Sequence, residues 1–143
     1  MLAKKILLAF DGSNLSNKAL KKAAEIAKTD PSIQIDVVHV VSFPILTGEY
    51  VMADHSFESW ITEHGNEVIM HAKTVLSVLP NTFRAFVVEG ASPARIILEH
   101  AKKEQCDLIV MGSRGLSGIK EIFLGSVSHN VMQHATVPIL IVK

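Results

Sequence analysis

The chain has 143 residues, of which 48% are hydrophobic, so it is long enough for one domain with a substantial core. Its 14 basic and 14 acidic residues give a formal net charge of zero, which argues against binding to nucleic acid or an anionic membrane, because both require concentrated positive charge. Cys106 is the only cysteine, which excludes an intramolecular disulfide, and no apolar stretch has the length of a signal-peptide core or a membrane span. We therefore expect a cytoplasmic protein with no nucleic-acid or membrane partner.

The first half of the chain alternates strand-like and helix-like segments. Lys5–Phe10 is a short apolar run, as expected of a parallel strand that is covered on both faces. A polar stretch over residues 11–14 interrupts it, and apolar residues on one helical face predict a helix from Leu15 to Ala27. Ile33–Val41 is rich in β-branched residues and is predicted as the second strand. Ser42–Ser56 is predicted to be irregular, although it is unusually apolar for a loop.

The second half continues this alternation. We expect a long helix over Phe57–Leu79, a strand over Phe83–Val88, a helix from Ser92-Pro93 to Lys103, a strand over Asp107–Met111, a helix over Ser126–His134 and a closing strand over Val137–Val142. Five strands that alternate with four helices predict a doubly wound parallel sheet, in a single domain over residues 1–143. Ligands of such sheets bind beyond the carboxyl ends of the strands, so the turns that begin at Asp11 and Gly112 are expected to form the site.

Glycines are concentrated between the fourth strand and the last helix. Gly112 and Gly115 are separated by two residues, and Gly125-Ser126 follows after nine more. Glycines let the backbone approach a ligand and present its N–H groups, and the N-terminus of a helix favours phosphate. Arg114 and Lys120 add positive charge. A turn explains any one of these glycines, but the whole spaced set favours an anion-binding loop.

The arrangement Gly112-x2-Gly115-x9-Gly125-Ser126 is similar to the ATP-binding motif of the universal stress protein family. The resemblance covers essentially the whole chain, and four further segments carry it: Lys4–Ser13, Gly90–Pro93 followed by Ile96-Ile97, Cys106–Gly112 and Val137–Val142. It implies the strand order 3-2-1-4-5, ATP binding by a stress-response protein, and a homodimer joined through Val137–Val142. We expect Mg²⁺ or Mn²⁺ to accompany ATP by bridging its phosphates.

The resemblance also implies roles for individual residues. Asp11 would accept a hydrogen bond from the adenine amine, and Val40 would bind the base edge through its backbone, or Val41 if the strand register differs by one. Gly112 and Gly115 would contact the ribose and phosphate region, and the residues from Gly125 to Val127 would hold the phosphates. The complete set of expected nucleotide-binding residues is Asp11, Val40, Met111, Gly112, Arg114, Gly115, Gly125, Ser126 and Val127.

Other nucleotide and phosphate sites fit the sequence less well. Lys120 is not placed to complete a P-loop, and the dinucleotide fingerprint is missing after the first strand, where only Gly12 stands. A phosphoacceptor receiver domain would need clustered acids after the first strand, an aspartate after the third and a lysine near the end of the fifth. Here Asp11 is alone, the third strand ends at Glu89-Gly90, and Lys143 is terminal.

The histidines and the single cysteine are expected to have structural roles rather than to bind a metal or to react. The seven histidines are His39, His55, His64, His71, His100, His129 and His134. None of them forms the H-E-x-x-H zinc pattern, and His39 is expected to pack in or beside the second strand. Cys106 is expected to have no histidine or second cysteine nearby, and it precedes a buried strand, so we expect a packed thiol rather than a nucleophile.

The sequence therefore favours a nucleotide-binding module over an enzyme. No base or water-orienting group accompanies the glycine motif, so hydrolysis of ATP is expected to be slow at most. One reading is a regulator whose shape or partners change with ATP. The alternative is a member of the same stress family that acts as an interaction scaffold with little nucleotide affinity.

Overall fold

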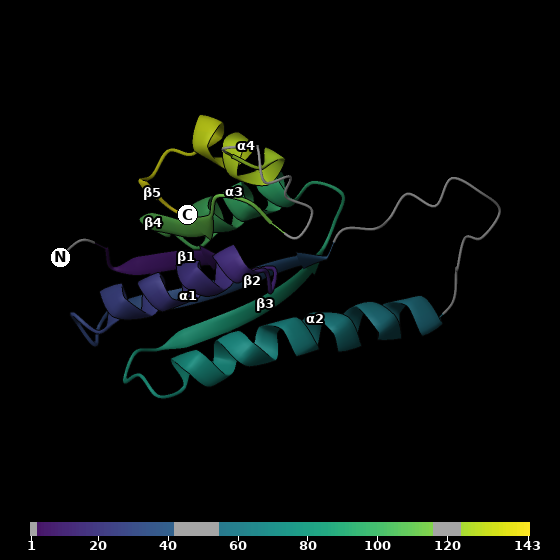
Figure 1. Ribbon diagram of the computed structural model, residues 1–143, viewed down its shortest axis with the longest axis horizontal. Coiled ribbons are helices and arrows are strands. Elements are labelled where there is room, and N and C mark those ends of the chain that lie inside the picture. Colours follow the sequence, from purple (N-terminus) through teal and green to yellow (C-terminus); the bar gives the residue numbers. More distant parts are fainter. Residues whose placement is uncertain (1–2, 42–54, 116–123) are drawn as a thin grey trace.

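The computed structural model describes residues 3–41, 55–115 and 124–143 (Figure 1). Strands and helices alternate in these residues: β1 (Lys5–Ala9), α1 (Asn14–Ala27), β2 (Gln34–Val41), α2 (His55–Leu76), β3 (Phe83–Glu89), α3 (Pro93–Lys103), β4 (Leu108–Gly112), α4 (Ser126–His134) and β5 (Ile139–Val142). All neighbouring strands pair in parallel, and the order across the sheet is β3-β2-β1-β4-β5. The predicted doubly wound sheet, with strand order 3-2-1-4-5 and four helices, is therefore confirmed.

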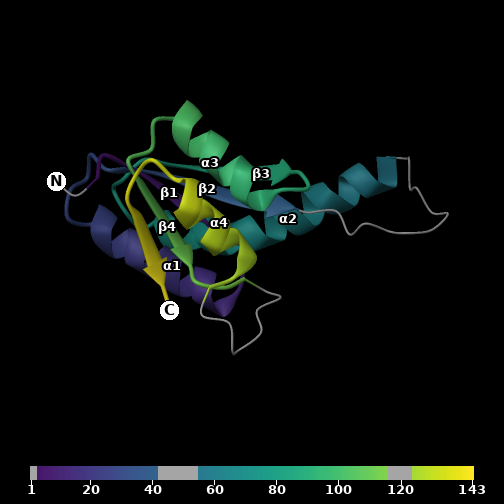
Figure 2. The same cartoon turned by 90° about the horizontal axis from the view of Figure 1, so that it is seen from above.

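Different pairs of helices cover the two faces of the sheet (Figures 1 and 2). In β1, Ile6 and Leu8 belong to the core beneath α1 and α2, whereas Leu7 belongs to the core beneath α3 and α4. All three side chains are fully buried. Successive side chains of a strand point to opposite faces, so a strand that is covered on both sides needs an unbroken apolar run. This is why the sequence of β1 does not alternate between apolar and polar residues.

Several element boundaries differ from the sequence prediction by one to three residues. The last strand begins at Ile139 rather than Val137. The long helix ends at Leu76 rather than Leu79, and the chain leaves it through a tight turn in which the N–H of Leu79 donates to the carbonyl of Leu76. The prediction that Ser42–Ser56 is irregular is wrong for residues 55 and 56, which begin α2, because no proline or glycine stops the helix there. The rest of that segment, residues 42–54, lies outside the described residues.

One face of α2 is buried against the core. Ile69, Ala72 and Leu76 are the buried hydrophobic residues in the described part of this helix, whereas Val68 and Val75 are partly buried. Both sets lie on one helical face, because positions three and four residues apart are neighbours. In the parts of the chain that the structure describes, no helix combines the length and apolarity that crossing a bilayer demands.

Candidate functional site

The candidate site lies at the carboxyl ends of β1 and β4. These strands are neighbours, and the strand order reverses between them, because β2 and β3 lie on one side and β5 lies on the other. Asp11 follows β1 after one residue, and Gly112 is the last residue of β4. Ligands of doubly wound sheets bind at such a switch point. The two turns singled out by the sequence are therefore brought together by the topology; we call this region the carboxyl-edge site.

Asp11 and Gly115 approach each other closely across this edge. One carboxylate oxygen of Asp11, Oδ1, accepts a hydrogen bond from the N–H of Ser13 (2.9 Å). A β-carbon on Gly115 would lie only 2.6 Å from the other oxygen, Oδ2. Gly12 has φ of +82°, a left-handed conformation that glycine adopts without strain, and it turns the chain between Asp11 and Ser13. Gly115 therefore lacks a side chain where one would displace the Asp11 carboxylate.

Gly112 has a different and purely steric surrounding. A β-carbon at this position would lie 2.9 Å from the Cβ of Leu15 and 3.0 Å from its backbone carbonyl carbon. Leu15 is in the first turn of α1, so the end of β4 and the start of α1 approach each other only because residue 112 has no side chain. The packing of this helix against the strand accounts for Gly112 whether or not a ligand contacts it.

The N-terminus of α4 is tied to the end of β4 through Ser113. The N–H of Gly125 and the hydroxyl of Ser128 each donate to the carbonyl of Ser113 (2.7 Å in both cases). The N–H of Ser113 in turn donates to the carbonyl of Val142 in β5 (2.8 Å). The N-cap residue of α4 is Gly125, which has no side chain with which to cap the first N–H groups of the helix. The N-cap residue therefore leaves these groups without a side-chain cap beside the carboxyl edge.

The remaining residues of the expected set differ in exposure. Ser126 is exposed, Val127 is half-buried against the core beneath α3 and α4, Arg114 is half-buried, and Met111 is buried in that same core. A buried Met111 side chain leaves only backbone groups for contact with a ligand. Lys120, which was expected to add positive charge, lies outside the described residues.

The backbone of β2 distinguishes Val40 from Val41. The N–H of Phe10 donates to the carbonyl of Val38 (3.0 Å), and the N–H of Gly90 donates to the carbonyl of Val41 (3.1 Å). Residues two apart on a strand direct their backbone groups to the same side, so Val40 faces the side of β1 beyond its last residue. Val41 instead faces β3. Of the two residues that the sequence offers for contact with a base, Val40 is the one that faces the Asp11 turn.

Ser113, Ser128 and His39 support the carboxyl-edge site but were not singled out for it. His39 was expected only to pack in or beside the second strand, which is confirmed, since it is 9% exposed within β2. Its Nδ1 donates to the carbonyl of Phe10 (2.9 Å), which fixes the residue before Asp11. Burial lowers the pKa of His39, partly opposed by this hydrogen bond and by the charge of Asp11, and so favours the neutral imidazole. In the sequence, the signal for this role of His39 is that a polar residue stands within an apolar strand.

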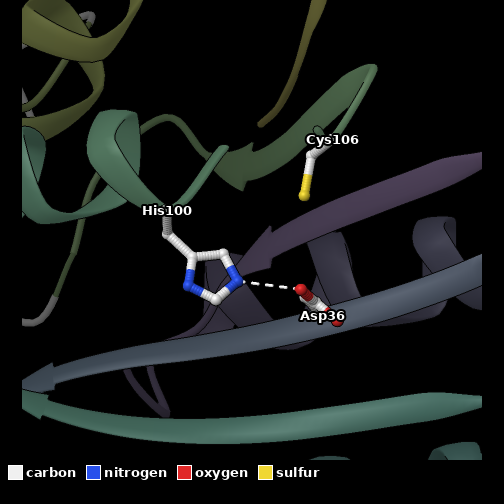
Figure 3. Close-up of side chains that lie close together, drawn as sticks. All are labelled: Asp36, His100 and Cys106. Atoms are coloured by element: carbon white, nitrogen blue, oxygen red, sulfur yellow. Dashed lines mark hydrogen bonds and ion pairs between the residues drawn. The ribbon is translucent and has the colours of Figure 1, made fainter. Parts of the chain in front are cut away.

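A second group of polar side chains lies at the opposite, amino ends of the strands. Asp36 is 1% exposed in β2, and its Oδ2 is 2.8 Å from Nε2 of His100 (Figure 3). One oxygen of Asp36, one ring nitrogen of His100 and the sulfur of Cys106 all lie within 4.8 Å of one another. The expectation that Cys106 has no histidine near it is therefore wrong in three dimensions, because α3 folds back over the sheet and brings His100 to it. The expectation that the thiol is packed is confirmed, at 3% exposure.

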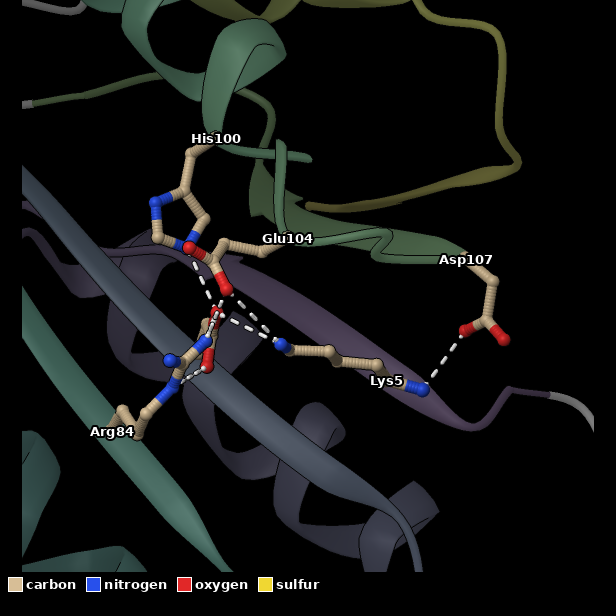
Figure 4. A network of polar contacts seen from close by, with 6 residues as sticks. Lys5, Arg84, His100, Glu104 and Asp107 are labelled. Atoms are coloured by element: carbon tan, nitrogen blue, oxygen red, sulfur yellow. Dashed lines mark hydrogen bonds and ion pairs between the residues drawn. The ribbon is translucent and has the colours of Figure 1, made fainter. Parts of the chain in front are cut away.

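Charged residues surround this buried carboxylate (Figure 4). Arg84 donates to both oxygens of Asp36, through Nε (3.0 Å) and Nη2 (2.8 Å), and also to Glu104 (2.8 Å). Nζ of Lys5 is 3.6 Å from both Asp36 and Glu104. Burial by itself raises the pKa of Asp36, but the hydrogen bonds from Arg84 and His100 and the charge of Lys5 lower it overall. We call Lys5, Asp36, Arg84, His100, Glu104 and Cys106 the Asp36 cluster.

Comparison with known proteins gives a consistent result over the whole chain. The model of the universal stress protein family matches residues 3–143. Universal stress protein YxiE of Bacillus subtilis is 40% identical over 153 aligned residues, which cover 97% of this chain and 98% of the relative.

Solved structures show the same fold. The structure of MJ0577 from Methanocaldococcus jannaschii superposes with a TM-score of 0.87 at 29% identity, covering 100% of this chain and 97% of the other. A universal stress protein family protein from Arabidopsis thaliana, solved with AMP bound, superposes with a TM-score of 0.71, covering 98% of this chain and 91% of the other. Its identity of 19% supports a shared fold alone.

Proposed function

This chain belongs to the universal stress protein family, and we propose that it binds ATP at the carboxyl-edge site and acts as a nucleotide-dependent regulator in a stress response. The observation that carries the proposal is the close approach of Gly115 to the Asp11 carboxylate. It joins the turn expected to contact the base to the loop expected to contact the ribose and phosphates. The similarity of the glycine spacing to the ATP-binding motif of the family supports an adenine nucleotide as the ligand.

The residues at this edge fit an adenine nucleotide from both ends. At one end, the Asp11 carboxylate would accept a hydrogen bond from the adenine amine, and the backbone of Val40 would meet the edge of the base. At the other end, Gly125, Ser126 and Val127 would hold the phosphates, because uncapped N–H groups and the positive end of the helix dipole favour anions. Between them, Gly112, Arg114 and Gly115 would border the ribose and phosphates, with the backbone of Met111 behind.

Mg²⁺ or Mn²⁺ would accompany ATP through its phosphate oxygens rather than through protein ligands. Hard divalent cations of this kind commonly bind phosphates with few or no protein ligands of their own. Asp11 is the acidic residue of the proposed site, and its proposed position is at the base. We therefore propose a binding protein, with hydrolysis at most slow, because no metal-bound carboxylate or water-orienting base is assigned near the phosphates.

We also propose a homodimer that is joined through residues 137–142. β5 is the last strand of the sheet, and its four residues are apolar and half-buried. The carbonyl of Pro138 accepts from Ile109, and the carbonyl of Val142 accepts from Ser113, so Leu140 between them also faces β4. The backbone groups of Ile139 and Ile141 then face the outer edge. Antiparallel pairing with a second copy would satisfy these groups and stop at two chains.

The dimer is tested by removing one outward N–H group. Ile141→Pro deletes an N–H on the outer edge, whereas Leu140→Pro deletes one that faces β4 and serves as the matched control. We expect the wild type to be a dimer by light scattering coupled to size exclusion, and Ile141→Pro to be a folded monomer. The circular dichroism spectrum should report greater loss of structure in Leu140→Pro. A monomeric wild type, or a fully dimeric Ile141→Pro, would contradict this interface.

An interaction scaffold with little nucleotide affinity is the second candidate function. It is supported by the steric explanation of Gly112, which needs no ligand. We propose that the protein acts in the cytoplasm. Analysis of protein purified from there distinguishes an ATP-binding regulator from a scaffold. Denaturation should release an adenine nucleotide that mass spectrometry identifies. Protein that carries no nucleotide and gains none on incubation with ATP and Mg²⁺ would favour the scaffold.

A further inference from the structure

The Asp36 cluster contains three different metal-binding side chains that converge within the molecule. A carboxylate oxygen of Asp36, a ring nitrogen of His100 and the sulfur of Cys106 lie within 4.8 Å of one another. In Figure 3 the sulfur points from the segment before β4 toward the His100 ring and the Asp36 carboxylate. Asp36 is 64 residues from His100 in the sequence, so the cluster exists only in the folded protein.

The thiol of Cys106 has no partner in the ion-pair network that satisfies Asp36. Its sulfur makes no hydrogen bond to any residue that the structure describes, although the residue is only 3% exposed. The ring of His100 is held beside it by Asp36 and by edge-on contact with Phe86, at a centroid distance of 4.7 Å. An unpartnered buried thiol beside an oriented imidazole and a carboxylate is a donor set without an assigned function.

We propose that Asp36, His100 and Cys106 form a binding site for a borderline-soft divalent cation such as Zn²⁺. One thiolate, one imidazole and one carboxylate are all accepted by Zn²⁺ and Co²⁺ in tetrahedral geometry, whereas Mg²⁺ and Ca²⁺ prefer oxygen ligands. Tetrahedral bonds of about 2.0–2.3 Å place donor atoms roughly 3.3–3.7 Å apart, so binding requires movements of about 1 Å. Water or the Glu104 carboxylate would have to supply the fourth ligand.

Charge and protons balance when the ion binds. The cation replaces the proton of the Cys106 thiol, which leaves to solvent, and the metal–sulfur bond forms without any oxidation or reduction. It also replaces the hydrogen between His100 and Asp36, and the displaced proton moves to Nδ1, so the imidazole stays neutral while Nε2 binds the ion. Before binding, the carboxylates of Asp36 and Glu104 balance the charges of Lys5 and Arg84. The thiolate that forms on binding then offsets half of the charge of the divalent ion.

The site would be independent of the proposed nucleotide site. It lies at the amino ends of the strands, whereas the carboxyl-edge site lies at the other end of the same sheet. A cation that accompanies ATP would be hard and bound to phosphate oxygens. The Asp36 cluster would instead select a cation that binds sulfur and nitrogen ligands. Failure of either proposal therefore leaves the other standing.

Titration of the metal-free full-length protein with Co²⁺, without nucleotide, tests this site. Because Cys106 is the only cysteine, a thiolate-to-cobalt charge-transfer band reports binding at this residue and not at surface histidines. We expect the band and the visible bands of tetrahedral Co²⁺ to saturate at one ion per chain and to disappear when Zn²⁺ is added. Absence of the charge-transfer band in folded protein at saturating Co²⁺ would overturn the proposal.

Two variants and a matched control sharpen the result. Cys106→Ser should abolish the charge-transfer band, and His100→Gln, which keeps the thiol, should weaken Co²⁺ binding at least tenfold. His129→Gln removes an exposed histidine on α4 and should leave the titration unchanged. If Cys106→Ser does not fold, the comparison of His100→Gln with the wild type decides alone. Equal Co²⁺ affinity of these two proteins would contradict a role for His100 and overturn the site.

Discussion

The two ends of the sheet are built from different chemical groups. At the carboxyl ends of the strands, the candidate site is built mainly from backbone, because Gly112, Gly115 and Gly125 have no side chains. At the amino ends, the Asp36 cluster is built from long charged side chains that satisfy one another around a carboxylate that is 1% exposed. The first end relies on backbone groups, whereas the charges of the second are paired with one another.

Because of this difference, we expect the amino ends of the strands to contribute mainly to stability and the carboxyl ends mainly to ligand binding. A buried carboxylate that loses its partners costs free energy, so the Asp36 cluster should contribute strongly to stability. Side chains are excluded from the carboxyl edge, so changes there should affect ligand binding, except where a glycine also allows two elements to pack. Removal of single groups at each end tests this division.

The largest expected effect is the loss of charge at Asp36. Asp36→Asn keeps the shape of the side chain but removes the buried one of the two carboxylates that Arg84 and Lys5 share, which leaves them only Glu104. We expect the free energy of unfolding, measured by urea titration at neutral pH, to fall by about 3 kcal/mol. The exposed pair between Arg95 and Glu99 on α3 is the control, and Arg95→Gln should change stability very little. Equal effects of the two substitutions would remove the distinction between buried and exposed pairs.

The effect of Asp36→Asn should depend on pH in a defined direction. The pKa of Asp36 is lowered in the folded protein, so its ionised form adds stability above the pKa of the unfolded chain. That contribution is lost as the pH falls through the lower, folded-state pKa. The difference in unfolding free energy between wild type and Asp36→Asn should therefore be full at neutral pH and shrink in acid, below the ordinary pKa of an aspartate. A difference that is constant with pH would contradict the assigned charge interaction.

The steric role of Gly112 gives the next largest effect. Gly112→Ala places a β-carbon against the backbone of Leu15, so α1 or β4 must shift, and we expect a loss of about 2 kcal/mol in unfolding free energy. Gly115→Ala is the matched control at the same edge. Its β-carbon meets only the end of the Asp11 side chain, which can move, so its stability should stay closer to the wild type. The reverse order of stability would contradict the packing described at β4.

Selectivity between ATP and GTP is the smallest of these effects. The Asp11 carboxylate would accept from the adenine amine but repel the carbonyl oxygen of guanine. GTP should therefore bind at least about tenfold more weakly than ATP, a difference of about 1.4 kcal/mol, and Asp11→Ala should narrow that gap. Calorimetric titration with both nucleotides measures it. Equal wild-type affinities would remove Asp11 from recognition of the base.

The sequence could predict the strands and helices because their signals are local. The unbroken apolar run of β1 and the Ser-Pro start of α3 need no knowledge of the rest of the chain, and the elements appear within a few residues of these positions. The start of the last strand, β5, differs from the predicted one by two residues. β5 begins at Ile139 because Pro138 has no N–H to contribute to a ladder.

The contacts that define both ends of the sheet could not be read from the sequence. Asp36 is one acidic residue within an apolar strand, and nothing local relates it to Arg84 or His100, which reach it through β3 and α3. The carboxyl edge was easier to predict, because the spacing of its glycines is itself a pattern. Even there, the contact of Gly115 with Asp11 and that of Gly112 with Leu15 required the folded chain, which separates a proposed binding role from a packing role.

Calorimetric titration of ATP and Mg²⁺ into wild type and Gly115→Val tests the central claim most directly. A branched side chain at this position would displace the Asp11 carboxylate and fill the space between the two turns. We predict that the wild type binds one ATP per chain with a roughly micromolar Kd, about 8 kcal/mol of binding free energy. The folded variant should show no measurable binding. A variant that titrates like the wild type, or a wild type that binds no ATP, would contradict the assignment of the carboxyl edge as the nucleotide site.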